Sequence, residues 1–557
     1  MKKRLFALLL VTCMLLSFVA GCASKDAGGG KDQDSTTAAA PDKKAADKDT
    51  KSGDPAAPES KYQTTYGSKQ FDNVTIKVEL FDRSNAPEGS TITDNKWVKY
   101  VNEQMSKVGI NVEFVTVPRW DEVVKMQSMM ASGTAPDITL TYTYAHAEDY
   151  FQQGGTWDLV PFIDGAGQAE NMKAYLGDNV LDIGRTVNNE LYGIVAKRAV
   201  TTKSNFFIRK DWLDGLNRKV PTTVDELYDT LKQFVRENPD GRKDVVGAQF
   251  WNQWNTRMLF SELAGNEKEM DISSGDSAVG DYYDKGIREF FRFMNKLYND
   301  GLLNPEYYTL SEDDFKSQIV TGQLAFFEYS VNGSVDVLRG SLLKTLQENV
   351  PTADIISIPP MKNVKDGKQY SGAYPAGGLI AFCPLTASEE VVEACMTYLD
   401  WMCTKDGGFV LYHGFEGEHF EFDADGVPIV KDASYNSTDK DWIRTDIFLT
   451  GNQGYFATVD EFMVCSSKEA PGYEDKVIEN YKNAAVGDII FDTTFTSAST
   501  PSLITDIDII KDDYRVKCIT CTPDKFDATY DEYLGELEEA GVKTIVEERT
   551  EYYNSIY

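Results

Sequence analysis

Aromatic rings beside amide and charged side chains are the groups of this sequence best suited to binding chemistry. The stretch Trp251-Asn252-Gln253-Trp254 places two indoles and two amides within four residues. Tyr142 and Tyr144 follow one predicted strand, and Arg83 and Asn85 follow another. Flat rings stack on the C–H faces of a ligand, while amides, carboxylates and arginines hydrogen-bond at its edge. The same rings could instead fill a core or lie in solvated loops.

Residues for catalysis are sparse by comparison. The chain has only three histidines, His146, His413 and His419, and it contains no HExxH, GxSxG or GxxxxGK[ST] motif. Among its 88 acidic residues, some pair will resemble the two carboxylates of a glycosidase by chance. The sequence therefore favours binding over catalysis, and an anchored glycoside hydrolase or polysaccharide lyase remains the alternative.

The elements that must position these rings begin with alternating strands and intervening helices. Residues 73–81, 109–117 and 137–142 read as strands, and apolar residues at helical spacing lie between them, from Trp97 to Val108 and from Trp120 to Met130. This order predicts a doubly wound parallel sheet. Ligands of such sheets bind beyond the carboxyl ends of the strands, where Arg83 and Tyr142 lie.

A second set of elements follows residue 195. Residues 205–209, 321–327 and 377–382 are predicted strands. A helix is predicted to begin after Pro221 with Thr223 and Glu226 as a capping box, and a longer helix over 287–298 to end at Gly301. A further helix over 391–402 is expected, with Thr386 and Glu389 at capping spacing.

The amino terminus has the pattern of a secretory signal. A basic head is followed by an apolar run and by Val19-Ala20-Gly21-Cys22. That ending resembles the lipobox of bacterial lipoproteins, which implies cleavage before Cys22 and acylation of Cys22; an ordinary signal with a chance cysteine is the alternative. Residues 23–60 contain no aromatic residue, Leu, Ile or Val, so a flexible tether is expected.

Composition limits the partners. The formal charge is −32, and it becomes −35 if Lys2, Lys3 and Arg4 leave with the signal. Binding to nucleic acid is not expected, because it requires clustered cations; an anionic ligand would need only a local basic pocket. Six cysteines remain beyond residue 22, and their pairing is left open. The lone CxxC at 518–521 has no nearby histidine, so a zinc site is not expected.

Several segments together resemble one family. These segments are Ala131-Ser-Gly-Thr-Ala-Pro-Asp-Ile138, Leu191-Tyr-Gly-Ile194, residues 207–213 with 221–227, Thr321-Gly-Gln-Leu-Ala325, and Gly377-Gly-Leu-Ile-Ala381 with Tyr398-Leu-Asp-Trp401. In this order the chain resembles the extracellular solute-binding lipoproteins of carbohydrate ABC importers, in the large alginate-binding-protein-like branch of solute-binding family 1. The resemblance covers most of the chain beyond residue 70.

The resemblance implies an α/β, two-lobe periplasmic-binding-protein-like fold of type II, with lobes joined by crossing strands at a hinge. It places a signal peptide at 1–21, the tether at 22–66, lobe 1 at 67–195, lobe 2 at 196–372, a return to lobe 1 at 373–430, and a segment completing both lobes at 431–557. It implies no enzyme activity. A monomer on the outer face of the cytoplasmic membrane would clamp an oligosaccharide and deliver it to permease subunits; a receptor for a peptide is a further possibility.

The resemblance also extends the set of expected ligand contacts. Added to the residues above, they are Lys203 at the crossing, Tyr329 and Asn332 after the strand near 321–327, Tyr374 before the return strand, and Glu416 and His419 in Gly414-Phe-Glu-Gly-Glu-His419. Core packing or loop structure is the alternative for each. Long relatives carry a calcium loop, but this sequence offers only Asn238, Asp240 and Asp244, too few for the six or more oxygens that calcium prefers. A plain turn without cofactor is expected, and a weak calcium site at these three residues is the alternative.

Overall fold

The computed structural model describes residues 69–165, 167–186, 188–237, 239–251, 253–274, 277–331, 342–374, 377–451, 454–491 and 497–556. All of them belong to one compact unit, Ser60–Tyr557. The predicted signal, Cys22 and nearly all of the predicted tether lie outside the described residues. No helix of the described part is both long and apolar enough to cross a bilayer.

The first core is built on two parallel strands. β1 (Val74–Asp82) pairs with β2 (Ile110–Pro118) in continuous register, and α2 (Lys96–Ser106) connects them. The side chain of Asn95 begins this helix by accepting hydrogen bonds from the N–H groups of Trp97 and Val98. These elements were predicted from their hydrophobic periodicity, and the structure confirms them.

The sheet is not parallel throughout, so the prediction of a doubly wound parallel sheet is only partly right. Ile138 continues the parallel pairing by a bridge to Val78, but β3 (Thr139–Thr141) pairs antiparallel with β10 (Gly377–Phe382). β10 also pairs antiparallel with β4 (Ile194–Lys197). A strand from a distant part of the chain thus enters this sheet. Local periodicity carries no information on strand direction, because that depends on tertiary pairing.

Short helices complete this part of the chain. They are η1 (Arg119–Asp121), α3 (Glu122–Ser132), α4 (Tyr144–Gln152), α5 (Val160–Ile163), α6 (Glu170–Leu176), α7 (Asp178–Leu181) and η2 (Asp182–Gly184). The later elements are α17 (Glu389–Met402), η3 (Lys405–Phe409), α18 (Val410–His413), β11 (Phe420–Phe422), β12 (Pro428–Val430), α19 (Ala433–Asn436), η4 (Ser437–Asp441) and α20 (Arg444–Ile447). Of these, α17, α18 and α20 contribute buried residues to the same apolar core. α3 stops before Gly133, which has a φ of +67° as a helix-ending glycine requires.

The second part has a mixed sheet in the order β6-β7-β5-β8. β6 (Val246–Phe250) and β7 (Leu324–Ser330) are parallel, whereas β5 (Ser204–Arg209) is antiparallel to β7 and to β8 (Ile355–Ile358). The helices in this stretch are α8 (Lys210–Gly215), α9 (Val224–Glu237), α10 (Trp254–Met258), α11 (Glu267–Ser274), α12 (Ser277–Tyr283), α13 (Gly286–Asn299), α14 (Glu312–Val320) and α16 (Leu342–Asn349).

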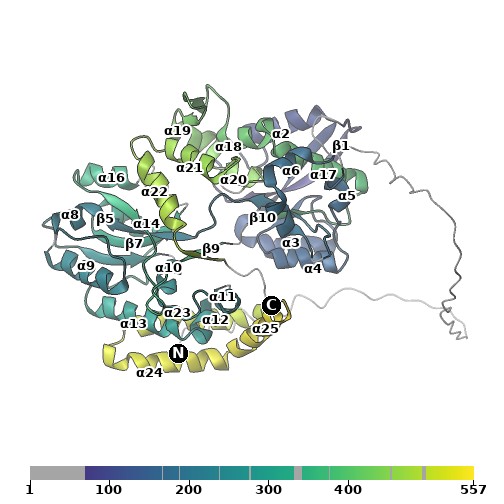
Figure 1. Ribbon diagram of the computed structural model, residues 1–557. Helices are drawn as coiled ribbons and strands as arrows, with labels where there is room; N and C mark the ends of the chain where they lie inside the picture. Colours follow the sequence, from purple (N-terminus) through teal and green to yellow (C-terminus); the bar gives the residue numbers. More distant parts are fainter. Residues whose placement is uncertain are drawn as a thin grey trace, which may run out of the picture. The chain divides into compact units, whose positions relative to one another are not determined.

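The last elements add to this second part. They are α21 (Val459–Lys468), α22 (Glu474–Ala484), β13 (Asp488–Phe491), α23 (Thr500–Thr520), η5 (Pro523–Lys525), α24 (Phe526–Glu539) and α25 (Val542–Ile556). β13 pairs in parallel with β9 (Tyr370–Ala373). The yellow helices of Figure 1, α23 and α24, contribute Ile507, Tyr530 and Tyr533 to the core that also buries Phe290 and Phe291 of α13.

Two helix starts differ in detail from the predictions. The Thr223 hydroxyl accepts a hydrogen bond from Glu226 N–H. The carboxylate of Glu226, however, accepts hydrogen bonds from the N–H and hydroxyl of Thr222, one residue before the predicted cap. α17 is capped by Ser388, which accepts from Val391 N–H, and not by Thr386. The end of α13 is as predicted, since Gly301 has a φ of +70°. Spacing thus located the turns, while the local backbone selected the capping residue.

Candidate functional site

Three segments carry the chain between the two apolar cores, and they are hydrogen-bonded to one another. The segment 197–203 leaves β4 and enters β5, and β9 leads back toward β10. Lys203 N–H donates to Gly372 O at 2.9 Å, and Tyr374 N–H donates to Thr201 O at 2.8 Å. Lys197 N–H donates to Thr450 O on a third segment. These are the crossing strands that the family resemblance implied.

A row of cations and rings lies along these crossings; we call Arg198, Lys203, Trp254 and Tyr374 the crossing cluster. The guanidinium carbon of Arg198 is 4.7 Å from the centre of the Tyr374 ring. Lys203 Nζ lies 5.4 Å from the same ring and 3.2 Å from the centre of Trp254. Tyr374 is 36% exposed, whereas Lys203 is buried. Three residues predicted separately, Lys203, Trp254 and Tyr374, are therefore brought together.

A second group lies at the carboxyl ends of β1, β2 and β3; we call Arg83, Arg119, Trp120 and Tyr142 the strand-end cluster. The Arg119 guanidinium carbon lies 4.3 Å from the Tyr142 ring centre and 5.3 Å from that of Trp120. Arg83 is 5.9 Å from Trp120, whose side chain is 80% exposed. Arg83 and Tyr142 were predicted site residues. Trp120 was not among the predicted site residues, although its place at the end of a predicted strand was the available signal.

Both arginines of the strand-end cluster are neutralised by carboxylates. Arg83 donates two hydrogen bonds to Asp446, at 2.6 and 2.9 Å, and Arg119 donates to Glu122 at 3.1 Å. Burial raises the pKa of Asp446 and of Glu122, while the arginines oppose that rise. Asn85, also predicted, donates to the carbonyl of Trp442 at 3.1 Å. Arg83 and Asn85 thus fasten the end of β1 to the segment around α20.

The indole of Trp254 is positioned by a buried polar network at the start of α10. Glu328 is fully buried and accepts hydrogen bonds from Asn255 N–H at 2.8 Å and Thr256 N–H at 3.0 Å. Asn255 donates to Ser204 O on β5 and accepts from Gly372 N–H on β9. Carboxylates are stabilised at a helix amino terminus, where N–H groups lack intrahelical partners. Nothing in the sequence pattern had singled out Glu328 or Asn255.

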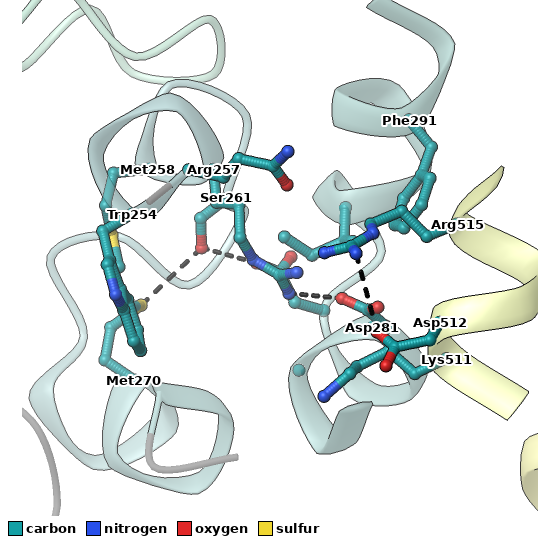
Figure 2. Close-up of a pocket in the computed structure, with 14 residues that line it drawn as sticks. Trp254, Arg257, Met258, Ser261, Met270, Asp281, Phe291, Lys511, Asp512 and Arg515 are labelled. Carbon is teal, nitrogen blue, oxygen red and sulfur yellow. Dashed lines mark hydrogen bonds and ion pairs between the residues drawn. The ribbon is translucent and has the colours of Figure 1, made fainter. Parts of the chain in front are cut away.

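Trp254 also lines a cavity of about 220 Å³ in the second part of the chain. Figure 2 shows Trp254, Met258 and Met270 on one side and Asp281, Lys511 and Arg515 on the other. Trp254 follows Gln253, which holds a φ of +57°, uncommon for a residue with a side chain and enriched at ligand sites. Since Lys203 covers Trp254 at 3.2 Å, a ligand would have to stack elsewhere on that ring.

Other predicted rings are held by the protein itself. Trp251 packs on Phe315 with 5.8 Å between ring centres, so the two indoles of 251–254 do not form one platform. The Tyr144 hydroxyl donates to Gly378 O at 2.6 Å, and its side chain is buried. The buried Tyr329 donates to Glu312 at 2.6 Å. Asn252 and Asn332 lie outside the described residues.

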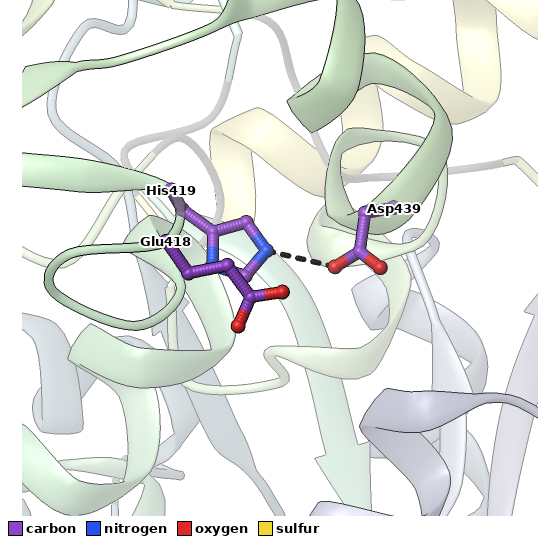
Figure 3. A group of neighbouring side chains, drawn as sticks. All are labelled: Glu418, His419 and Asp439. Atoms are coloured by element: carbon purple, nitrogen blue, oxygen red, sulfur yellow. Dashed lines mark hydrogen bonds and ion pairs between the residues drawn. The ribbon is translucent and has the colours of Figure 1, made fainter.

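The loop with Glu416 and His419 lies beside α2. Glu416 is exposed, and His419 is fully buried. Glu418, His419 and Asp439 group closely enough to suggest a metal site (Figure 3). However, the N–H of Phe415 donates to Nδ1 of His419, so the ring proton is on Nε2 and points to Asp439 at 2.7 Å. Lys96 already pairs with Glu418 at 2.6 Å. These contacts fit a closed hydrogen-bond network better than a cation site.

The predicted weak calcium loop has its carboxylates engaged by other donors. Asp240 accepts from Arg209 at 3.0 Å and from Trp212 Nε1 at 2.8 Å. Asp244 pairs with Arg242 at 3.0 Å, and Asn238 lies outside the described residues. The Arg209 side chain is only 1% exposed, so a dication at Asp240 would lie beside a buried guanidinium. The residues described here do not fit a calcium site.

The six cysteines of the described residues are free thiols. At the CxxC, Cys521 Sγ donates to Cys518 O at 3.3 Å, within the end of α23. Burial raises the pKa of the Cys518 thiol to about 12, which disfavours the thiolate that a metal would require.

Comparisons with known proteins identify the class. The family model described as bacterial extracellular solute-binding protein matches residues 97–412, more than half of the chain, so the chain belongs to this family. Solved structures share its two-domain solute-binding fold: the alginate-binding protein AlgQ2 without calcium ion has a TM-score of 0.56 and 17% identity, covering 88% of this chain and 100% of that one. An HMO-binding, ABC-transporter-associated solute-binding protein from Bifidobacterium longum infantis has a TM-score of 0.60 and 16% identity, and the match covers 86% of this chain and 99% of that one.

Curated relatives come from Bacillus subtilis. The polygalacturonan/rhamnogalacturonan-binding protein YtcQ is 24% identical over 58% of this chain and 62% of its own length. The lipoprotein LipO is 24% identical over 57% of this chain and 63% of its own length. The chain therefore spans about three fifths of the curated relatives it matches. The family and its neighbours are binding proteins.

Proposed function

We propose that the protein is a lipid-anchored receptor that captures an oligosaccharide at the crossing segments and delivers it to an ABC importer. The observation that carries this proposal is the crossing cluster, where cations and partly exposed rings gather at the segments between two cores of a solute-binding protein. Rings and hydrogen-bonding groups at one place match the faces and edges of sugar rings. Several relatives have names that mention glycans, including alginate, HMO, kestose and galacturonans.

Ligand capture fits the way the cores are connected. Closure of such proteins about a few crossing residues is a hinge motion, and ligand binding favours the closed state by its differential affinity. The three crossings are held together by backbone hydrogen bonds at Lys197, Lys203 and Tyr374, so they can act as one hinge. The permease would then recognise the closed state, and Cys22 would hold the monomer at the outer face of the cytoplasmic membrane.

The proposal includes neither catalysis nor a cofactor. A hydrolase or lyase would need a carboxylate pair or a base beside the ligand, whereas the carboxylates at the strand-end cluster, Asp446 and Glu122, are bound to arginines. The engagement of Asp240 by Arg209 supports function without calcium.

The test is a thermal-shift and calorimetric screen of the purified chain against plant and host oligosaccharides, with chromatography of each mixture. A rise in melting temperature without new products supports the receptor. New products would establish the enzyme alternative, and stabilisation by peptides instead of glycans would redirect the ligand class. Membrane fractionation of wild type and Cys22→Ala tests the anchor, which predicts release of the variant.

A further inference from the structure

Arg198 differs from the arginines of the strand-end cluster in having no carboxylate partner in the part of the chain that the structure describes. Among the described residues, its hydrogen bond runs from Nε to the carbonyl of Gly377 at 3.2 Å, and it makes no ion pair. Its guanidinium faces the ring of Tyr374, and Tyr142 and Tyr144 are close enough to interact with it electrostatically. Arg198 therefore carries a positive charge among tyrosines, with no carboxylate of the described residues beside it.

This arrangement costs free energy in the unliganded protein. Arg198 is partly buried, and even partial burial of a cation without a paired anion is unfavourable, because the protein replaces only part of its hydration. The pKa of Arg198 is lowered by that burial, and the neighbouring tyrosines counteract the effect only in part. A structural arginine would be expected to have a carboxylate partner, as Arg83 has in Asp446. An unpaired one at the ligand-binding crossing suggests that the ligand supplies the anion.

The shape of the group indicates which anion. A guanidinium presents a planar fork that matches a carboxylate, and such charge-assisted pairs are stronger than neutral hydrogen bonds. The partly exposed Tyr374 beside the fork offers a ring face for a sugar. The net charge of −32 gives no general attraction for anions, so this local charge must provide the selectivity.

We propose that the ligand is an acidic oligosaccharide whose uronic-acid carboxylate binds Arg198 while its sugar ring packs on Tyr374. This inference rests on the proposed function and specifies its substrate class. The strand-end cluster cannot take the same role without breaking existing pairs, since Arg83 and Arg119 are held by Asp446 and Glu122.

The experiment compares each acidic ligand with a neutral ligand of the same stereochemistry. Oligomers of galacturonate, of mannuronate and guluronate, and of glucuronate are titrated calorimetrically into the full chain, each beside its carboxyl-reduced counterpart. At least one oligouronate should bind, and its reduced form should bind on the order of 10- to 100-fold more weakly. Arg198→Gln should bind the acidic ligand more weakly by a similar factor, and its affinity for the reduced ligand should change little. Arg198→Lys should lose less affinity for the acidic ligand than Arg198→Gln does.

Two further measurements separate binding from folding. Arg236→Gln removes the same charge from a guanidinium that is 74% exposed and pairs with its neighbour Glu237, so it serves as the matched control with unchanged affinity. If Arg198 serves the ligand, Arg198→Gln should melt without ligand at the wild-type temperature or higher, because an unpaired and partly buried charge is removed. A lower melting temperature, together with an equal loss of affinity for the acidic and the reduced ligand, would overturn the inference in favour of a structural role.

The remaining outcomes distinguish this inference from the proposed function. Tight binding of neutral oligosaccharides with no preference for their acidic counterparts would overturn the acidic-ligand inference and leave the receptor function intact. Binding of no glycan in any form would overturn both.

Discussion

A buried carboxyl group in the first core gives a quantitative test of the structure. Glu79 on β1 is fully buried; one oxygen accepts from Leu140 N–H at 2.9 Å, and the other has no hydrogen-bond partner among the described residues. Burial raises the pKa of Glu79 from 4.5 to about 8, opposed by the Leu140 hydrogen bond and reinforced by Glu122. The folded protein therefore keeps Glu79 protonated at pH values where the unfolded chain has released the proton.

The direction of the pH effect follows from this difference. Because the folded pKa is the higher one, the stabilising contribution is complete below pH 4.5 and is lost as pH rises through about 8. The loss is about 1.4 kcal/mol per pH unit, or roughly 4–5 kcal/mol over the whole window. Glu79→Gln cannot release this proton. At pH 5 the variant should be as stable as wild type or slightly less so, and at pH 8.5 it should be more stable by a few kcal/mol.

The measurement is urea unfolding of wild type and Glu79→Gln at half-unit steps from pH 4.5 to 9. The difference between the two free energies cancels the titrating groups that do not interact with Glu79. Glu113→Gln is the matched control, because Glu113 lies exposed on the neighbouring strand β2. A wild-type curve and a Glu79→Gln curve that run parallel across this range would refute the reasoning.

Three further predictions concern the site. Asn255→Ala leaves Ser204 O and Gly372 N–H without their partner, so unfolding free energy should fall by about 2–4 kcal/mol and oligosaccharide affinity should drop with it; unchanged values in calorimetry would show that Asn255 does not couple β5 to β9. Trp120→Ala should change stability by less than about 0.5 kcal/mol, since the ring is 80% exposed, yet weaken oligosaccharide binding roughly 2- to 10-fold; equal affinities would remove Trp120 from the site. Addition of EDTA or calcium should leave the melting temperature unchanged because Arg209 engages Asp240, and a calcium-dependent rise of several degrees would contradict that interpretation.

The sequence determined by itself the elements that depend on near neighbours along the chain. Period-two alternation located β1 and β2, helical spacing located α2 and α13, and Gly301 marked a helix end by its freedom to adopt positive φ. The order of such segments was also enough to reveal the family. These features follow from local steric preferences and from the need to bury one face of each helix or strand. Both can be recognised from a short stretch of neighbouring residues.

Only the tertiary structure decided which of the candidate side chains are available. In the folded chain β3 pairs with the distant strand β10. Trp251 packs on Phe315 in an apolar core, whereas Trp254 lines a cavity and contacts Lys203. The tertiary structure also paired Arg83 with Asp446 and left Arg198 without a carboxylate partner among the described residues. These ion pairs and ring contacts depend on distances between segments that lie tens to hundreds of residues apart in the sequence. Those distances are set by packing of the whole chain, so no local pattern could show that Arg83 pairs with a carboxylate while Arg198 has none among the described residues.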